Sequence, residues 1–320
     1  SPCIYLTSFI MHVKRIPIMG VPDRSKLLTE KKNPRTKDID TKGALEIVDI
    51  INQEDRRVAL AVRKERKNIA RAIDLIVEAF GRGGRLFYIG AGTSGRLGIL
   101  DASEMPPTFG TPPELVRGII AGGKEAVFRS VEGAEDSRQG GLLAITTVGV
   151  KAGDVVVGVA TGGTTPFVQS ALRRARKLKA RTIFLTSNPD TDPEVPVDVV
   201  IRPVTGPEVV TGSTRMKAGT ATKLVLNTLT TAAMIKTGRV YGNLMVDLKA
   251  TNNKLADRAE RIIVELTGLS RQASRNLLKK AQGRAKTAIV MHLLGLGYKE
   301  AQGRLHLYGG SLRRVLETNS

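Results

Sequence analysis

The spacing of apolar residues changes along the chain, from helical to strand-like and back to helical. From Asp55 to Phe80 apolar residues recur every three to four positions, and the glycines that follow are typical of a helix end. Short apolar runs then predict buried strands over 86–89, 115–121, 154–160, 182–186 and 197–201. Helical patterns separate most of these runs. The sequence therefore predicts an α/β fold, a doubly wound parallel sheet flanked by helices.

After the last predicted strand the pattern is helical only. A loop over 207–214 precedes a predicted helix from Arg215 to Ile235, and a second helix is expected over about 244–266. Beyond Gly268 glycines break the helical pattern into short pieces. We expect three parts: a disordered N-terminal extension at 1–24, a sheet-containing domain with N-terminal helices at 25–266, and a small helical domain at 267–320.

Two turns rich in glycine and hydroxyl groups each follow a predicted strand and precede a predicted helix. They read GAGTSG at 90–95 and TGGTTP at 161–166. Glycines let the backbone approach a phosphate, and the first N–H groups of a helix attract negative charge. In a doubly wound sheet both turns would open at the carboxyl edge, where ligands bind. The candidate phosphate-binding residues are Gly92, Thr93, Ser94, Thr161, Thr164 and Thr165.

The first turn also has the G-x-G-x-x-G spacing of a dinucleotide site, but only formally. The acidic ribose ligand expected about 20 residues later is absent from 109–113, and the turn lacks the lysine of a nucleotide-binding P-loop. The hydroxyl groups favour a phosphosugar instead. An ordinary tight turn between strand and helix remains the alternative.

Carboxylates lie close to this predicted edge in the sequence. Glu104 ends a helix predicted over 96–104 and stopped by Pro106 and Pro107, while Glu135 lies in an acidic segment at 132–136. Each of these carboxylates could simply be solvated. Their number near one edge favours acid/base chemistry, because a carboxyl group desolvated beside a phosphate has a raised pKa.

Composition excludes several other classes of function. Lys and Arg exceed Asp and Glu by 50 to 30, but the basic residues are spread along helical segments, as on solvated faces. Aromatic residues are only 4% and Trp is absent, which argues against a nucleic acid partner bound by base stacking. One Cys and three scattered His argue against a metal site. Without a membrane-length apolar run or a secretory leader, we expect a cytoplasmic protein with no membrane partner.

Several segments together resemble one enzyme family, that of the N-acetylmuramic acid 6-phosphate etherases. They read LLTEKKNPRTKDID, GAGTSGRLGILDASEMPPTFG, IIAGG, VEGAEDS, GPEVVTGSTRMKAGTATKLVLN and VYGNLMVDLKATNNKL, and the likeness covers about residues 26–310. The family belongs to the sugar isomerase (SIS) domain superfamily and is related to the glucokinase regulatory protein. The resemblance makes 25–266 a SIS phosphosugar-binding domain.

The resemblance implies cleavage of the D-lactyl ether of N-acetylmuramic acid 6-phosphate to N-acetylglucosamine 6-phosphate and D-lactate, in amino sugar catabolism and peptidoglycan recycling. It places the family's two acid/base glutamates on Glu104, as proton donor, and Glu135. It implies substrate contacts at both turns, with Ser213 a further candidate. It also implies a homodimer with the site near the subunit boundary, and neither cofactor nor metal.

The chain departs from the family pattern at three positions. Met105 stands where Cys is usual, Gly162 where Ser is usual, and Thr164 where Arg is usual. The hydroxyl missing at Gly162 could come from Thr161 or Thr164, and the change bears on phosphate affinity and substrate range.

Three other functions remain as alternatives. A non-catalytic phosphosugar-binding regulator would bind without turnover, although the regulatory relative has two SIS modules. A sugar-responsive transcription factor would need a helix-turn-helix, for which 1–54 is too short and irregular. A sugar-phosphate aldose–ketose isomerase shares the enolisation step.

Overall fold

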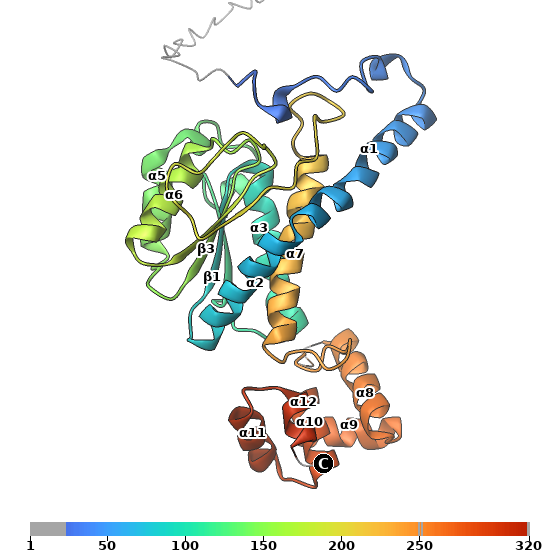
Figure 1. Ribbon diagram of the computed structural model, residues 1–320. Coiled ribbons are helices and arrows are strands. Elements are labelled where there is room, and N and C mark those ends of the chain that lie inside the picture. The colour runs from blue at the N-terminus through green and yellow to red at the C-terminus, as the bar shows by residue number, and fades with distance from the viewer. Residues whose placement is uncertain (1–23, 249, 251, 319–320) are drawn as a thin grey trace, which may run out of the picture.

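A five-stranded parallel sheet forms the centre of the larger part of the molecule (Figure 1). The computed structural model describes residues 24–248, 250 and 252–318, so the predicted extension lies outside the described residues except for residue 24. The strand order is β2-β1-β3-β4-β5, and every neighbouring pair is parallel. The strands are β1 (Leu86–Gly90), β2 (Val116–Ile120), β3 (Val155–Val159), β4 (Arg181–Leu185) and β5 (Val199–Ile201). The predicted fold class is confirmed.

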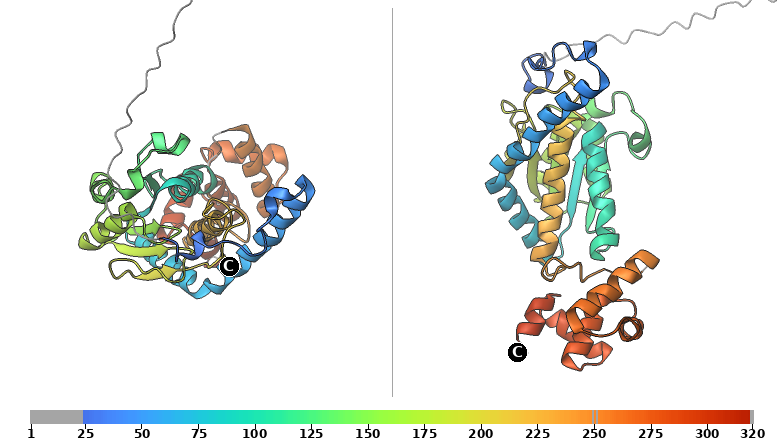
Figure 2. Two further views of the ribbon diagram at one scale, coloured as in Figure 1. Left: turned by 90° about the horizontal axis from the view of Figure 1, so that it is seen from above. Right: turned by 90° about the vertical axis from the view of Figure 1, so that its right-hand side faces the viewer.

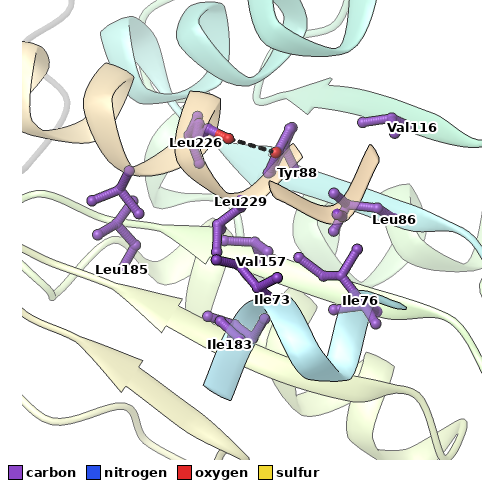
Figure 3. Close-up of a cluster of buried hydrophobic side chains, with 14 of the residues drawn as sticks. Ile73, Ile76, Leu86, Tyr88, Val116, Val157, Ile183, Leu185, Leu226 and Leu229 are labelled. Carbon is purple, nitrogen blue, oxygen red and sulfur yellow. Dashed lines mark hydrogen bonds between the residues drawn. The ribbon is translucent and has the colours of Figure 1, made fainter. Parts of the chain in front are cut away.

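Helices cover both faces of this sheet. One face packs against α2 (Arg66–Gly81), α3 (Gly92–Phe109) and α7 (Lys217–Lys236), and the other against α5 (Arg138–Thr147) and α6 (Pro166–Lys177). Along β1, Leu86 and Tyr88 enter the first apolar cluster, shown in Figure 3, while Phe87 and Ile89 enter the second. Because both of their faces are buried, the central strands β1 and β3 are apolar throughout instead of alternating with polar residues.

The predicted helix at 55–80 is in fact two helices. A first helix, α1 (Ala44–Lys64), leans outward beyond the sheet, and Glu65 separates it from α2. The apolar spacing continues across Glu65, so the pattern carried no mark of the break. Two single-turn 3-10 helices, η1 (Leu28–Glu30) and η2 (Ile39–Thr41), precede α1.

The prediction that Pro106 and Pro107 end the helix after β1 was also wrong. Both prolines lie inside α3, which continues to Phe109 and ends at Gly110, a residue in the left-handed conformation (φ 60°). Proline has a helix-compatible φ, so it removes hydrogen bonds without forcing the chain to turn. Met105 and Phe109 are buried in the apolar cluster, which keeps the last turn of α3 against the sheet.

The connection from β2 to α5 contains two short helices, α4 (Glu125–Phe128) and η3 (Ala134–Asp136). The first of these, α4, is a single helical turn. Among the described residues, no helix has both the length and the apolarity that crossing a membrane requires.

The C-terminal helices form a separate bundle at the opposite end of the sheet from the N-terminal segment (Figures 1 and 2). They are α8 (Asn253–Thr267), α9 (Arg271–Lys280), α10 (Ala285–Leu294), α11 (Tyr298–Leu307) and α12 (Leu312–Glu317). The first begins later than expected, because the Asn252 side chain caps it by accepting the N–H of Leu255. It shares its apolar cluster with α9–α12 and not with the sheet. We therefore propose a domain boundary ahead of Val246 instead of at 266.

Candidate active site

The two predicted turns lie side by side, because they follow the neighbouring strands β1 and β3. The hydroxyl oxygens of Ser94 and Thr161 are 3.3 Å apart. Together the turns line a cavity of about 250 Å³ at the carboxyl edge of the sheet. Its lining includes seven of the nine predicted site residues: Gly92, Thr93, Ser94, Glu135, Thr161, Thr164 and Thr165.

The first turn depends on a glycine that a larger residue could not replace. A Cβ at Gly90 would lie 2.8 Å from the Gly95 nitrogen and 2.9 Å from the Ser94 carbonyl carbon. This close approach lets α3 begin at Gly92, directly after the strand. The first N–H groups of α3 have no carbonyl one turn earlier to bond, so they favour an anion at this end of the cavity.

The second turn is held from behind by side chains. Gly163 has φ +83°, a conformation that favours glycine, and its carbonyl accepts a hydrogen bond of 2.6 Å from Gln169 Nε2. The Gly162 carbonyl accepts a hydrogen bond from the Thr191 hydroxyl at 3.1 Å. These contacts fix the turn, while Thr161, Thr164 and Thr165 line the cavity.

A third wall of the cavity comes from the N-terminal segment, whose residues were not among the predicted site residues. Leu27, Thr29 and Glu30 line the cavity together with Arg24. The segment is attached at its backbone: Leu28 N donates to Asn188 Oδ1 at 3.2 Å, and Thr29 O accepts from Gly212 N at 3.2 Å. Its only signal in the sequence was the segment LLTEKKNPRTKDID.

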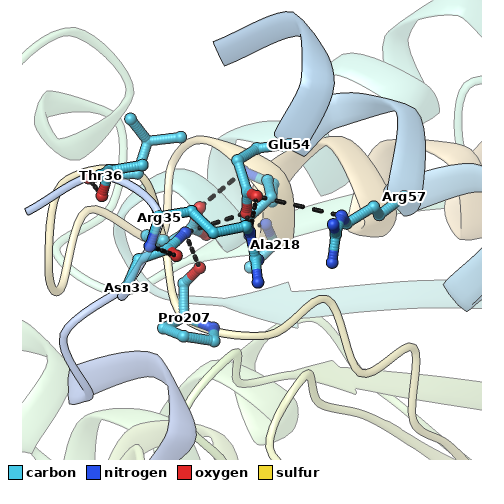
Figure 4. A network of polar contacts seen from close by, with 10 residues as sticks. Asn33, Arg35, Thr36, Glu54, Arg57, Pro207 and Ala218 are labelled. Atoms are coloured by element: carbon cyan, nitrogen blue, oxygen red, sulfur yellow. Dashed lines mark hydrogen bonds and ion pairs between the residues drawn. The ribbon is translucent and has the colours of Figure 1, made fainter. Parts of the chain in front are cut away.

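A buried ionic network joins this N-terminal segment to α1 and α7 (Figure 4). Glu54 of α1 is almost fully buried, and its carboxylate contacts Arg35 Nε at 2.5 Å, Asn33 Nδ2 at 2.9 Å and Lys217 Nζ at 2.5 Å. The hydrogen bond from Arg35 makes the largest contribution to lowering the pKa of Glu54 to about 2. The network therefore stabilises the third wall from outside the cavity.

A second buried carboxylate positions the start of α7. Glu208 accepts hydrogen bonds from the backbone N–H groups of Lys217, at 3.0 Å, and Ala218, at 2.9 Å. Burial raises its pKa above the ordinary value. Its contacts are those of a helix cap, which satisfies N–H groups that would otherwise be buried without partners.

The two predicted acid/base glutamates are not brought together within one chain. Glu135 lies in η3 and lines the cavity, in a connection that Arg96 holds by donating to Val127 O at 2.9 Å. Glu104 is exposed on α3, twelve residues after Gly92 and thus about 18 Å farther along the helix axis. Ser213 is also absent from the cavity lining, where its neighbour Thr214 takes part instead.

Close relatives establish the family of this chain. The N-acetylmuramic acid 6-phosphate etherase of Symbiobacterium thermophilum is 56% identical over 272 residues, which cover 85% of this chain and 90% of that protein. The enzyme of the same name from Synechocystis sp. is 49% identical over 302 residues, covering 94% of this chain and 99% of that protein. This chain belongs to the N-acetylmuramic acid 6-phosphate etherase family.

Other comparisons match parts of this etherase-family chain. Residues 68–176 match the family model described as glucokinase regulatory protein N-terminal SIS domain. A phosphoheptose isomerase structure from Francisella tularensis is 18% identical with a TM-score of 0.49, covering 61% of this chain and all of that one.

In the cavity of this etherase-family member, some residues are suited to binding a phosphate group and others to transferring protons. Hydroxyl groups and the N-terminus of α3 are suited to binding a phosphate group. Glu135 and Glu30 add carboxylates that accept or donate protons. Among the described residues there is no cluster of side chains suited to hold a metal ion.

Proposed function

We propose that this chain cleaves the D-lactyl ether of N-acetylmuramic acid 6-phosphate, giving N-acetylglucosamine 6-phosphate and D-lactate in the recycling of cell-wall amino sugars. The observation that carries the proposal is 56% identity to an etherase over 90% of that enzyme's length. The cavity supports it, since phosphate-binding turns and the carboxylate of Glu135 line the same space. We place the reaction in the cytoplasm, because a phosphorylated sugar does not cross a bilayer.

The elimination step needs two proton transfers, both within the chemistry of carboxyl groups. Opening of the sugar ring makes C1 an aldehyde, which acidifies the proton on C2. One carboxylate removes that proton, the C3–O bond breaks, and a carboxylic acid protonates the departing lactate oxygen. Water then adds across the C2–C3 double bond to restore the sugar. We assign Glu104 as the proton donor and Glu135 as the second acid/base group.

Glu104 does not line the cavity of its own chain, so in this scheme it acts in the cavity of a second chain that associates with the first. We propose a homodimer with twofold symmetry in which the exposed face of α3 is covered by its copy. Leu100 lies one turn before Glu104 and is 52% exposed, and Phe128 of the adjoining α4 is 89% exposed. Antiparallel packing of the two α3 helices would bring Glu104 of each chain to the Gly92 end of the other. The same contact would desolvate the two carboxylates.

The proposed activity is tested by incubating the protein with N-acetylmuramic acid 6-phosphate and measuring D-lactate and N-acetylglucosamine 6-phosphate. Equal amounts of the two products are expected. Folded protein that releases no lactate would overturn the proposal. Binding without turnover would indicate a regulator, and interconversion of aldose and ketose phosphates without lactate would indicate an isomerase.

A further inference from the structure

Thr29 has a buried hydroxyl group with no hydrogen-bond partner among the described residues. The residue is only 3% exposed, and the unpartnered atom is its Oγ1. Buried hydroxyls are normally paired, because burial removes their hydrogen bonds to water. The nearby Thr36 follows this rule, since its hydroxyl donates to Val209 O at 2.8 Å. Among the described residues the Thr29 hydroxyl therefore has an unused capacity for a hydrogen bond.

The backbone of Thr29 is held in place at the wall of the cavity. Thr29 lines the same space as Ser94 and Thr161. The bond from Leu28 N to Asn188 Oδ1 and the bond from Gly212 N to Thr29 O hold the backbone on both sides of the Thr29 side chain. A molecule bound in the cavity would therefore meet Thr29 with its backbone already held in place.

Gly162 lies opposite Thr29, and neither space nor backbone conformation requires glycine there. A Cβ on Gly162 would lie 3.6 Å from Leu27 Cδ1 and 3.9 Å from Thr29 Oγ1, which are ordinary contact distances. Its backbone does not have the positive φ of Gly163. A serine at 162 would thus place its own hydroxyl beside that of Thr29.

We propose that the Thr29 hydroxyl hydrogen-bonds the phosphosugar in the cavity, beside Gly162, which supplies no side-chain hydroxyl. The inference rests on the proposed function for the identity of the sugar. It makes Thr29 a substrate-positioning residue, with no role in the proton transfers. It also makes positions 29 and 162 interdependent, because either one can carry the hydroxyl.

Binding of N-acetylglucosamine 6-phosphate, measured by titration calorimetry, tests the first part. Thr29→Val keeps the shape of the side chain but removes the hydroxyl, and we expect its Kd to rise about tenfold. Thr29→Ser keeps the hydroxyl and should stay within about threefold of wild type. The matched control is Thr36→Val, which removes a buried hydroxyl of the same segment outside the cavity lining. Equal Kd values for Thr29→Val and Thr36→Val would overturn the inference.

The interdependence is tested by repeating the Thr29→Val substitution in a Gly162→Ser background. We expect the rise in Kd to shrink from about tenfold to below about threefold there, since the serine hydroxyl replaces the one removed. The same fold-change in both backgrounds would contradict the link between the two positions.

Lactate release by the wild-type chain separates this inference from the proposed activity. Loss of binding in Thr29→Val together with no lactate from wild type would support the inference and overturn the activity. Lactate release with unchanged Kd in Thr29→Val would do the reverse. A wild-type chain that does not bind N-acetylglucosamine 6-phosphate would overturn the inference directly.

Discussion

Lys217 at the start of α7 and Glu54 on α1 form an ion pair with no access to solvent. Lys217 Nζ lies 2.5 Å from Glu54 Oε2, and the two side chains are 0% and 3% exposed. The pair joins the two helices through residues that are 163 positions apart in the sequence. It lies directly behind the N-terminal segment that lines the cavity, so the stability of the fold and the shape of the site depend on the same contact.

Removing the lysine should destabilise the protein strongly. In Lys217→Met a side chain of similar volume leaves the buried Glu54 carboxylate with less compensation, and we expect the free energy of unfolding to fall by about 3 kcal/mol. Denaturant unfolding measures this. Lys236→Met is the control, because Lys236 and Asp74 form an exposed pair at 3.7 Å that contributes less than about 1 kcal/mol. Equal losses in the two variants would contradict the role of the buried pair.

Glu54 should also make stability depend on pH in the acidic range. Its folded-state pKa is lowered from 4.5 to about 2, first by the hydrogen bond from Arg35. A lowered pKa contributes stability above the unfolded-state value, and that contribution is lost as the pH falls from about 4.5 to about 2. The loss is on the order of 3 kcal/mol.

The matched variant for this pH dependence is Glu54→Gln, which cannot ionise. It should be less stable than wild type at pH 7, and the difference should shrink as the pH approaches 2. Thermal melts of both proteins across this range measure the difference. Stability curves that stay parallel would show that another group causes the acid sensitivity.

Two glycines, one closely packed and one in open space, should differ in how substitution by alanine changes the stability of the protein. A Cβ on Gly118 of β2 would lie 2.5 Å from Ile99 Cα, so Gly118→Ala must push α3 away from the sheet, at about 1–3 kcal/mol. Gly81 at the end of α2 has nothing within 4 Å, and Gly81→Ala should change stability by less than about 1 kcal/mol. Denaturant unfolding of both variants measures the two changes in stability. A stable Gly118→Ala variant would contradict the close packing.

Mixed dimers test whether Glu104 acts in the partner's cavity. Glu104→Gln and Glu135→Gln should each abolish lactate release on their own. If the two glutamates of one site come from different chains, a mixed dimer has one intact site. Subunit exchange at equal amounts should then restore roughly a quarter of wild-type activity. Activity that stays at zero in verified mixed dimers would place both glutamates in the same chain.

The sheet was predictable because burial on both faces produces apolar runs that stand out in the sequence. The helix boundaries were less so, since they depend on tertiary contacts. The burial of Met105 and Phe109 carries α3 through two prolines, and nothing in the apolar spacing marks the separation of α1 from α2 at Glu65. The place of α8 in the C-terminal bundle is likewise a matter of which apolar surface it meets.

The site was predictable where its chemistry is local. Glycines and hydroxyls at the ends of β1 and β3 indicated the two turns, because parallel strands bring their carboxyl ends to one edge. Thr29 carries no such local signal, since it reaches the cavity only when the N-terminal segment folds back. The pairing of Glu104 with Glu135 stays a prediction, because the length of α3 keeps Glu104 away from the cavity of its own chain.

The attachment of the N-terminal segment has a consequence for the order of events during synthesis. Leu28 and Thr29 leave the ribosome early, but their backbone partners at Asn188 and Gly212 are made much later. The third wall of the cavity therefore cannot close on a nascent chain that ends before residue 212.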